Sequence, residues 1–334
     1  MVVTGASGWL GQNLVRALAK SSDRVRCLVT SSDGAALLEV VGPAVDVVVG
    51  DVRDPAAVDA LFEGIDGATV FHAAAVIHPA KRTREFFDVN VGGTQLVLDR
   101  SRRAGAARFV HVSSNSPFGA NRRPTDRFTE DAPYDPYLGY GKSKLEAELL
   151  VRQTHDRGDV AAVIVRAPWF YGPHQPERQT RFFATVRRGR FPIVGPGTQQ
   201  RSMVFTAHLV DGLVRAATAD AAPGRAYWIA DAEPYELRAI ITAVRRALDA
   251  EGLAVSGRPP TLPAVVGRGA ARADAVLQSA GLYVQPLHVL GELKDTIACD
   301  ISRARAELGY EPTTTLVDGM RASIRSCLER GDPL

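Results

Sequence analysis

A glycine loop near the start of the chain places the strongest constraint on its fold. Gly5, Gly8 and Gly11 follow the spacing G-x-x-G-x-x-G, after an apolar stretch at residues 1–4 and before a helical pattern that extends to Lys20. Such a loop permits a tight turn, lets the backbone approach a pyrophosphate and brings the helix close to the strand, and the helix N-terminus attracts phosphate. The loop therefore predicts the first βα unit of a dinucleotide-binding domain. An ordinary glycine-rich turn is the alternative.

Apolar, strand-like segments alternate with helical ones along the first half of the chain. The strands are expected at residues 24–30, 45–50, 68–75, 109–113 and 160–166, and the main helices at 90–105 and 140–157. This alternation predicts an α/β fold in which a doubly wound parallel sheet, of the Rossmann type, carries helices on both faces.

Beyond about residue 170 the loops are longer and richer in proline and glycine. Helical patterns are expected there at residues 209–219, 237–251, 264–280 and 301–308. We therefore expect a dinucleotide-binding Rossmann domain at residues 1–170. Residues 171–334 are expected to form a smaller, mostly substrate-binding α/β lobe that is intertwined with the first domain, and some of its segments should return to that domain.

Charge and cysteine content narrow the class of protein. The 40 basic and 37 acidic residues give a net charge of +3, and arginine clusters such as residues 187–190 are expected to be solvated faces rather than nucleic-acid sites. The three cysteines have no metal-ligand spacing, so we expect no metal site and a reducing, cytoplasmic setting. No apolar run approaches the roughly 18 residues of a membrane span. We expect a small-molecule substrate and neither a nucleic-acid nor a membrane partner.

Tyr140 and Lys144 form a candidate acid–base pair. A spacing of four residues on a helix places both side chains on one face. An ammonium beside a phenol stabilises the phenolate and lowers the pKa of the tyrosine, which can then exchange a proton with an alcohol oxygen. Ser113 and Ser114 end a predicted strand, where a hydroxyl can bind the same oxygen, although a serine-rich turn is the alternative. Each pattern is weak by itself, and their order behind the glycine loop favours an active site.

These motifs resemble those of the extended short-chain dehydrogenases/reductases, the superfamily of NAD-dependent epimerases/dehydratases and 3β-hydroxysteroid dehydrogenases. The resemblance covers nearly the whole chain. Beyond the glycine loop and the Tyr-Lys pair, the matching segments are Asp51-Val52, residues 72–75, Asn90, Phe118-Gly119, residues 166–173 and residues 300–312. Aligning Phe118-Gly119 on the family's Tyr-Gly makes Ser114, rather than Ser113, the catalytic serine.

The resemblance implies a role for each matching residue. Lys144 would bind the nicotinamide ribose and lower the pKa of Tyr140, Tyr140 would transfer the proton, Ser114 would orient the substrate oxygen, and Asn90 would complete the catalytic set. Hydride transfer itself is the cofactor's chemistry. The implied cofactor-binding residues are Gly5, Ser7, Gly8, Trp9, Leu10, Gly11, Thr30, Asp51, Val52, Ala73, Ala74, Ala75, Tyr140, Lys144 and Pro168. The family's usual homodimer is implied in the same way.

The end of the second predicted strand bears on the choice between NAD and NADP. An acidic residue there would hold the ribose hydroxyl of NAD and repel the extra phosphate of NADP. The segment at residues 28–33 reads LVTSSD, with no acid before Asp33 and no arginine. The missing acid favours NADP, although Asp33 could still reach the ribose.

Arg201 and Trp169 give opposite indications of the substrate. Arg201 is similar to the arginine that clamps the diphosphate of nucleotide sugars in epimerases, a task that suits a guanidinium, or it is an ordinary surface arginine. Trp169 stands where these enzymes usually carry a diphosphate-binding asparagine, and an indole would instead stack on a ring or close an apolar pocket. Residues 114–116 read SNS, where 4,6-dehydratases have Thr-Asp-Glu, and this disfavours dehydration.

The chain is therefore expected to be an NAD(P)-dependent oxidoreductase that acts on a secondary alcohol or ketone by hydride transfer, with Tyr140 as proton donor and acceptor. A nucleotide-linked sugar is the first choice of substrate, for a ketoreductase or an epimerase. The alternatives are a 3β-hydroxysteroid dehydrogenase-like or polyketide-type ketone reductase and, in another class, a non-catalytic dinucleotide-binding sensor. A sensor would not need a proton donor.

Overall fold

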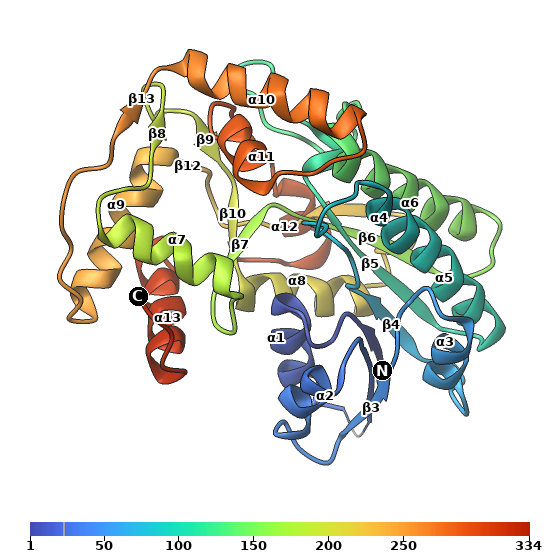
Figure 1. The fold of residues 1–334 in the computed structure, drawn as a ribbon. Coiled ribbons are helices and arrows are strands. Elements are labelled where there is room, and N and C mark those ends of the chain that lie inside the picture. Colours follow the sequence, from blue (N-terminus) through green and yellow to red (C-terminus); the bar gives the residue numbers. More distant parts are fainter. Residues whose placement is uncertain (23) are drawn as a thin grey trace.

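A seven-stranded parallel sheet forms the centre of the protein (Figure 1). The computed structural model describes residues 1–22 and 24–334. The strand order is β11-β6-β5-β4-β1-β2-β3, and every pair in the sheet is parallel. The strands are β1 (Val2–Thr4), β2 (Val25–Val29), β3 (Val45–Val49), β4 (Thr69–His72), β5 (Arg108–Ser114), β6 (Ala162–Ala167) and β11 (Ala226–Trp228). The predicted doubly wound α/β fold is confirmed.

Helices cover both faces of this sheet, because its central strands are apolar on both sides. One core cluster joins the sheet to α1, α8 and α12, and a second joins it to α3, α5 and α6. These helices are α1 (Trp9–Leu18), α3 (Pro55–Phe62), α5 (Thr94–Arg103), α6 (Leu138–Asp156), α8 (Thr206–Thr218) and α12 (Ser302–Leu308), with α2 (Ser32–Glu39), α4 (Arg84–Phe87) and a 3₁₀ turn at Ser116–Phe118 between them. Within the described residues, no helix combines the length and apolarity that crossing a bilayer requires.

The remaining elements form a smaller lobe with its own apolar core, in which side chains of α7, α9 and α13 meet. It contains three two-stranded sheets, β10–β7, β12–β9 and β13–β8. The elements are β7 (Trp169–Tyr171), α7 (Glu177–Arg187), β8 (Ile193–Val194), β9 (Gln200–Arg201), β10 (Met203–Phe205), β12 (Tyr235–Glu236), α9 (Leu237–Ala250), β13 (Thr261–Leu262), α10 (Ala264–Ser279), α11 (Gln285–Glu292) and α13 (Leu316–Glu329). The chain passes between the two parts, since α8, β11 and α12 pack with the large sheet.

The expected helix at residues 90–105 is not continuous. A π-helical turn at Asp88–Gly93 precedes α5. The wider turn places Asn90 so that its amide bonds the main chain of Val76, while the hydroxyl of Thr94 donates to the carbonyl of Asn90 at 2.6 Å. Such turns recur at functional sites, and this one packs against α6.

Helices α10 and α11 form a pair at one end of the molecule, drawn in orange and orange-red in Figure 1. α10 contacts β8 of the lobe and the N-terminal part of α6. The main-chain N–H of Gly139 donates to Oε1 of Gln278, and the N–H of Tyr283 donates to the carbonyl of Lys81. The pair therefore bridges the lobe and the large sheet above the helix that carries Tyr140.

Candidate active site

The glycine loop between β1 and α1 leaves no room for side chains. Gly5 has φ +68°, and a Cβ there would lie 2.7 Å from the main-chain nitrogen of Ala74. A Cβ on Gly11 would lie 2.1 Å from the carbonyl oxygen of Gly5. α1 follows Gly8 with no side-chain cap and no acidic residue in its first turn. Its N–H groups and positive dipole are therefore free for a phosphate, and the loop fits the pyrophosphate of a dinucleotide.

The other expected cofactor residues follow the carboxyl ends of several strands of the sheet. Ser7, Ala73, Ala74 and Ala75 are half-buried, Thr30 is exposed at the end of β2, and Pro168 is buried between β6 and β7. The side chains of Leu10 and Val52 belong to the core clusters. The indole of Trp9 donates to the carbonyl of Pro173 at 2.9 Å, which ties the glycine loop to the lobe.

Asp51, expected beside the adenine, is paired with Arg53. The guanidinium donates to both carboxylate oxygens, at 2.9 and 2.7 Å. These bonds lower the pKa of Asp51, and the same pair raises the pKa of Arg53. The guanidinium of Arg53 is therefore paired with the Asp51 carboxylate at this end of the sheet.

Ser114 and Tyr140 come together where β5 ends and α6 begins. The Ser114 hydroxyl lies 3.3 Å from Oγ of Ser116 and accepts the main-chain N–H of Ser116 at 3.2 Å. Burial raises the pKa of Tyr140 to about 12, while Ser114 opposes the rise by hydrogen bonding. The hydroxyl of Ser113 is buried and finds no partner among the described residues. Of the two serines, Ser114 is the one that acts on the phenol.

The pKa of Tyr140 is raised, in contrast to the expectation that Lys144 lowers it. The ammonium of Lys144 donates to the carbonyl of Val112 at 2.8 Å and lies 3.2 Å from Nε2 of His111. The side chain is 2% exposed, and burial lowers its own pKa to about 8. The cost of burying the phenolate therefore dominates the pKa of Tyr140.

Two buried histidines lie close to Lys144: His72 begins the segment at residues 72–75 that matches the family, whereas His111 was not selected from the sequence. His72 on β4 pairs in register with His111 on β5, and their rings stack at 5.6 Å. His72 also contacts the hydroxyls of Thr4 and Thr94, at 2.7 and 2.8 Å. Burial lowers the pKa of His72 to about 3 and that of His111 well below its ordinary value, so both rings are neutral.

Asn90 links three segments of the site. Its amide accepts the N–H of Val76 at 2.8 Å and donates to the carbonyl of Val76 and to Oγ of Ser143, both at 3.0 Å. Only 1% of the residue is exposed. Asn90 therefore holds the loop after β4 against α6, at Ser143, the residue before Lys144.

The side chains of Arg201 and Trp169 are both engaged by other parts of the protein. Arg201 was expected as a diphosphate clamp, and Trp169 as a ring that stacks on the substrate or closes an apolar pocket. Arg201 is 8% exposed, and its guanidinium donates to the main-chain carbonyl of Glu292. Burial lowers the pKa of Arg201, with the carboxylates of Glu292 and Asp295 opposing. The ring of Trp169 packs edge-on against Phe182 at 5.5 Å, in the lobe core. The guanidinium of Arg201 therefore already has a partner at the end of α11. The spacing of residues along the sequence could not reveal this contact.

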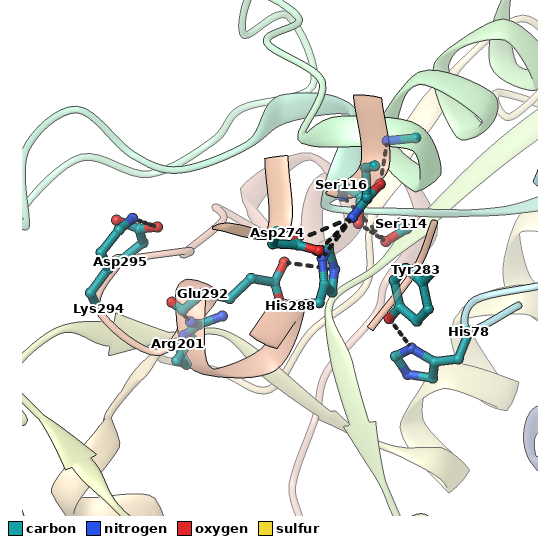
Figure 2. Close-up of polar contacts among 12 residues, drawn as sticks. His78, Ser114, Ser116, Arg201, Asp274, Tyr283, His288, Glu292, Lys294 and Asp295 are labelled. Carbon is teal, nitrogen blue, oxygen red and sulfur yellow. Dashed lines mark hydrogen bonds and ion pairs between the residues drawn. The ribbon is translucent and has the colours of Figure 1, made fainter. Parts of the chain in front are cut away.

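A polar cluster on α10 and α11 faces the same site (Figure 2). Nδ1 of His288 lies 2.8 Å from the Asp274 carboxylate, and Nε2 lies 3.9 Å from that of Glu292. The hydroxyl of Tyr283 lies 2.6 Å from Nδ1 of His78. The sequence predicted a helix at residues 264–280 but did not indicate that Asp274 on it meets His288 on the following helix.

No metal site accompanies these groups in the part of the chain that the structure describes, residues 1–22 and 24–334. No three His, Cys, Asp or Glu side chains there are arranged to hold a metal ion. Cys27, Cys299 and Cys327 are buried thiols.

Comparison with known proteins places these features in a family. Residues 1–230 match the family described as NAD dependent epimerase/dehydratase. The chain is 31% identical to a 4-hydroxy-2-methyl-3-oxo-4-farnesyl-3,4-dihydroquinoline-1-oxide ketoreductase of Stigmatella aurantiaca, over 96% of this chain and 94% of the relative. It is 32% identical to a 3β-hydroxysteroid dehydrogenase/Δ5→4-isomerase of Mycobacterium tuberculosis, over 94% of this chain and 86% of the relative.

A solved structure supports the fold. The UDP-glucuronic acid 4-epimerase of Bacillus cereus, in complex with NAD, superimposes with a TM-score of 0.77 over 98% of each chain, at 23% identity. The recognition of the extended short-chain dehydrogenase/reductase superfamily is confirmed.

Proposed function

The chain belongs to the NAD dependent epimerase/dehydratase family, and we propose that it interconverts a secondary alcohol and a ketone on an apolar ring system. It is an enzyme of the oxidoreductase type that this family contains. The proposal goes beyond the family only in the class of substrate. The residues around Arg201 and Tyr140 support the apolar class.

The proton chemistry rests on Tyr140 and Ser114. Because burial raises the pKa of Tyr140 to about 12, the phenol keeps its proton at neutral pH and can give it to a ketone oxygen. The Ser114 hydroxyl, at the same strand end, donates a hydrogen bond to that oxygen and stabilises its developing charge. The carbon exchanges a hydride with the nicotinamide, which is the chemistry that NAD supplies when bound.

The residues that would hold NAD are those of the glycine loop, with Lys144 beneath the nicotinamide ribose. We propose NAD rather than the NADP that the missing acid favoured. The extra phosphate of NADP needs a cation, and Arg53 is engaged by Asp51. The hydroxyl of Ser31 also has a partner, because it caps α2 by accepting the N–H of Gly34 at 3.1 Å.

The hydrogen bond of the Arg201 guanidinium to the main chain of α11 is the observation that supports an apolar substrate. A diphosphate would have to displace its bond to the Glu292 carbonyl, and the carboxylates of Glu292 and Asp295 would repel the incoming anion. An aromatic ring packs against the catalytic phenol instead. Phe86 lies 5.8 Å from the ring of Tyr140, and Tyr283 packs edge-on against Phe86 at 5.7 Å. The ketoreductase and hydroxysteroid dehydrogenase relatives act, by their names, on ring compounds of this kind.

A nucleotide-linked sugar is the second candidate, and Arg178 is the observation that favours it. This arginine is exposed near the start of α7, and its charge lowers the pKa of Tyr140. A guanidinium near the catalytic phenol is suited to a phosphate group.

The two substrate classes are separated by a reduction assay. Purified enzyme with NADH is offered trans-2-decalone, a bicyclic ketone, and in parallel the enzyme with NAD⁺ is offered UDP-glucose. We expect NADH consumption with decalone and no conversion of UDP-glucose. Conversion of UDP-glucose that an Arg178→Ala variant loses would overturn the apolar substrate in favour of the second candidate.

A further inference from the structure

Exposed apolar side chains gather on α10 and on the segment that follows it. Of the eleven large hydrophobic residues that are exposed within the described part of the chain, five lie between residues 265 and 284. They are Val265, Val266, Val276, Leu282 and Val284, with exposed fractions from 37% to 68%. Single exposed apolar residues are normal on a protein surface, whereas a cluster of them indicates an interaction site.

Helical spacing places the exposed residues of α10 on one face. Val265, Arg272 and Val276 follow one another at intervals of seven and four residues, which brings their side chains onto one side of a helix. The buried residues of this helix, on its other side, are Gly267, Ala270 and Asp274. Figure 1 shows α10 along the outer edge of the molecule. The exposed side is therefore an amphipathic helix face that is turned to solvent.

The exposed charges of this helix are positive. Asp274 is the one acidic residue between Glu251 and Glu292, and it is fully buried. Arg268 and Arg272 are exposed on α10. Their guanidinium groups therefore flank the apolar side chains without an exposed carboxylate in the same stretch of chain.

A second segment adds two cations beside this helix. Arg82 and Leu282 pair in an antiparallel bridge, so their side chains lie on the same side of that pair. The carbonyl of Lys81 accepts the N–H of Tyr283 at 3.0 Å, and Lys81 and Arg82 are both exposed. The five apolar residues form one surface, the α10 patch, with the cations Lys81, Arg82, Arg268 and Arg272.

We propose that the α10 patch docks the protein on the surface of a bilayer that contains anionic lipids. The valine side chains would enter the boundary between headgroups and acyl chains, and the arginine side chains would extend beside them to the phosphates. Aliphatic groups flanked by cations complement acyl chains beneath anionic headgroups. A helix that lies on a bilayer needs no run long enough to span it, and the expectation of no membrane partner rested on the absence of such a run. Docking does not depend on which substrate the enzyme takes.

The α10 patch borders the active site through Tyr283. Leu282 and Val284 are exposed, whereas Tyr283 between them is 7% exposed. The Tyr283 ring packs edge-on against Phe86 at 5.7 Å, and Phe86 lies 5.8 Å from the ring of Tyr140. A bilayer bound to the patch would therefore lie over the segment that covers the catalytic phenol.

Co-sedimentation with vesicles tests the proposal. The purified full chain is mixed with vesicles of phosphatidylcholine alone, or with about one third phosphatidylglycerol, at low and at high salt. The wild type should bind the anionic vesicles at low salt and be released by high salt. Each arginine near an anionic surface changes binding about fivefold, so Arg268→Gln with Arg272→Gln should weaken it by about 30-fold. Val265→Asp with Val276→Asp should weaken it by at least about 10-fold, since burial of one valine contributes that much.

Matched control variants carry the same kinds of change outside the α10 patch. Arg102→Gln with Arg103→Gln removes two exposed arginines of α5, and Val40→Asp replaces the 79% exposed valine at the end of α2. Both controls should bind the anionic vesicles as the wild type does. Urea denaturation shows whether each variant is folded before it is mixed with vesicles.

Salt-sensitive binding that both patch variants weaken and both controls keep supports docking on an anionic bilayer. Failure of the wild type to bind anionic vesicles, or a patch variant that binds them at the wild-type level, overturns it. A second copy of the chain on this face would overturn it as well. Light scattering would show that case as a dimer that Val265→Asp with Val276→Asp dissociates. Reduction assays without vesicles test the oxidoreductase proposal separately.

Discussion

Replacement of Lys144 by methionine should make the protein more stable and less active. Burial lowers the pKa of Lys144 from 10.5 to about 8. At about 1.4 kcal/mol per pH unit, keeping the ammonium charged in the interior at pH 7 costs about 3 kcal/mol. Loss of the bonds to the Val112 carbonyl and to His111 offsets about 1 to 2 kcal/mol of this. Lys144→Met should therefore raise the free energy of unfolding by about 1 to 2 kcal/mol.

The pH dependence of this difference identifies its cause. Between pH 8 and pH 10.5 the folded protein releases the Lys144 proton while the unfolded chain keeps it, so the stability of the wild type rises with pH. The advantage of Lys144→Met should shrink by about 2 kcal/mol between about pH 7 and about pH 9.5. Other groups titrate in both proteins and cancel in the difference.

Urea denaturation followed by tryptophan fluorescence at the two pH values measures these quantities. Lys142→Met on the same helix is the matched control, because Lys142 is exposed, and it should change stability by less than about 0.5 kcal/mol at either pH. The reasoning is wrong if Lys144→Met is clearly less stable than the wild type at neutral pH, or if the difference between them does not change with pH.

Three further predictions follow from other contacts. Glu148 and Arg166 form an ion pair whose side chains are both 0% exposed. Glu148→Gln should lower the free energy of unfolding by about 3 to 5 kcal/mol in denaturation experiments. The double variant Arg166→Met, Glu148→Leu should recover most of that loss. Gly11→Ala places a methyl group 2.1 Å from the Gly5 carbonyl oxygen and should abolish NAD binding measured by calorimetry. An unchanged affinity for NAD would contradict the assignment of the glycine loop as the pyrophosphate site. In the oxidative direction, the rate should rise with pH toward about 12, the pKa of Tyr140, and a profile flat above neutral pH would argue against the phenol.

The architecture of the sheet was predictable because it depends on periodicity. Valine-rich segments such as residues 45–50 and the loop at Gly5, Gly8 and Gly11 are local signals, and the structure has β3 and the loop where they were expected. The π-helical turn around Asn90 was not predictable, because it follows from the bonds of its amide to Val76, a contact between segments.

The candidate site was predictable only in part, for the same reason. Motif spacing identified Tyr140 and Ser114, which the structure brings together. The electrostatics came out differently, since burial dominates the pKa of Tyr140 and Lys144 faces His111. Arg201 was interpreted from its sequence neighbours, whereas its partner, Glu292, lies far along the chain on α11.

The central claim is that Tyr140 transfers the proton in a ketone–alcohol interconversion. Its most direct test is the consumption of NADH with trans-2-decalone by the wild type and by Tyr140→Phe, which removes only the hydroxyl. Because a positioned acid contributes about 10²- to 10⁴-fold, the variant should be slower by at least about 100-fold while it binds NAD as the wild type does. A variant that consumes NADH as fast as the wild type would contradict the account.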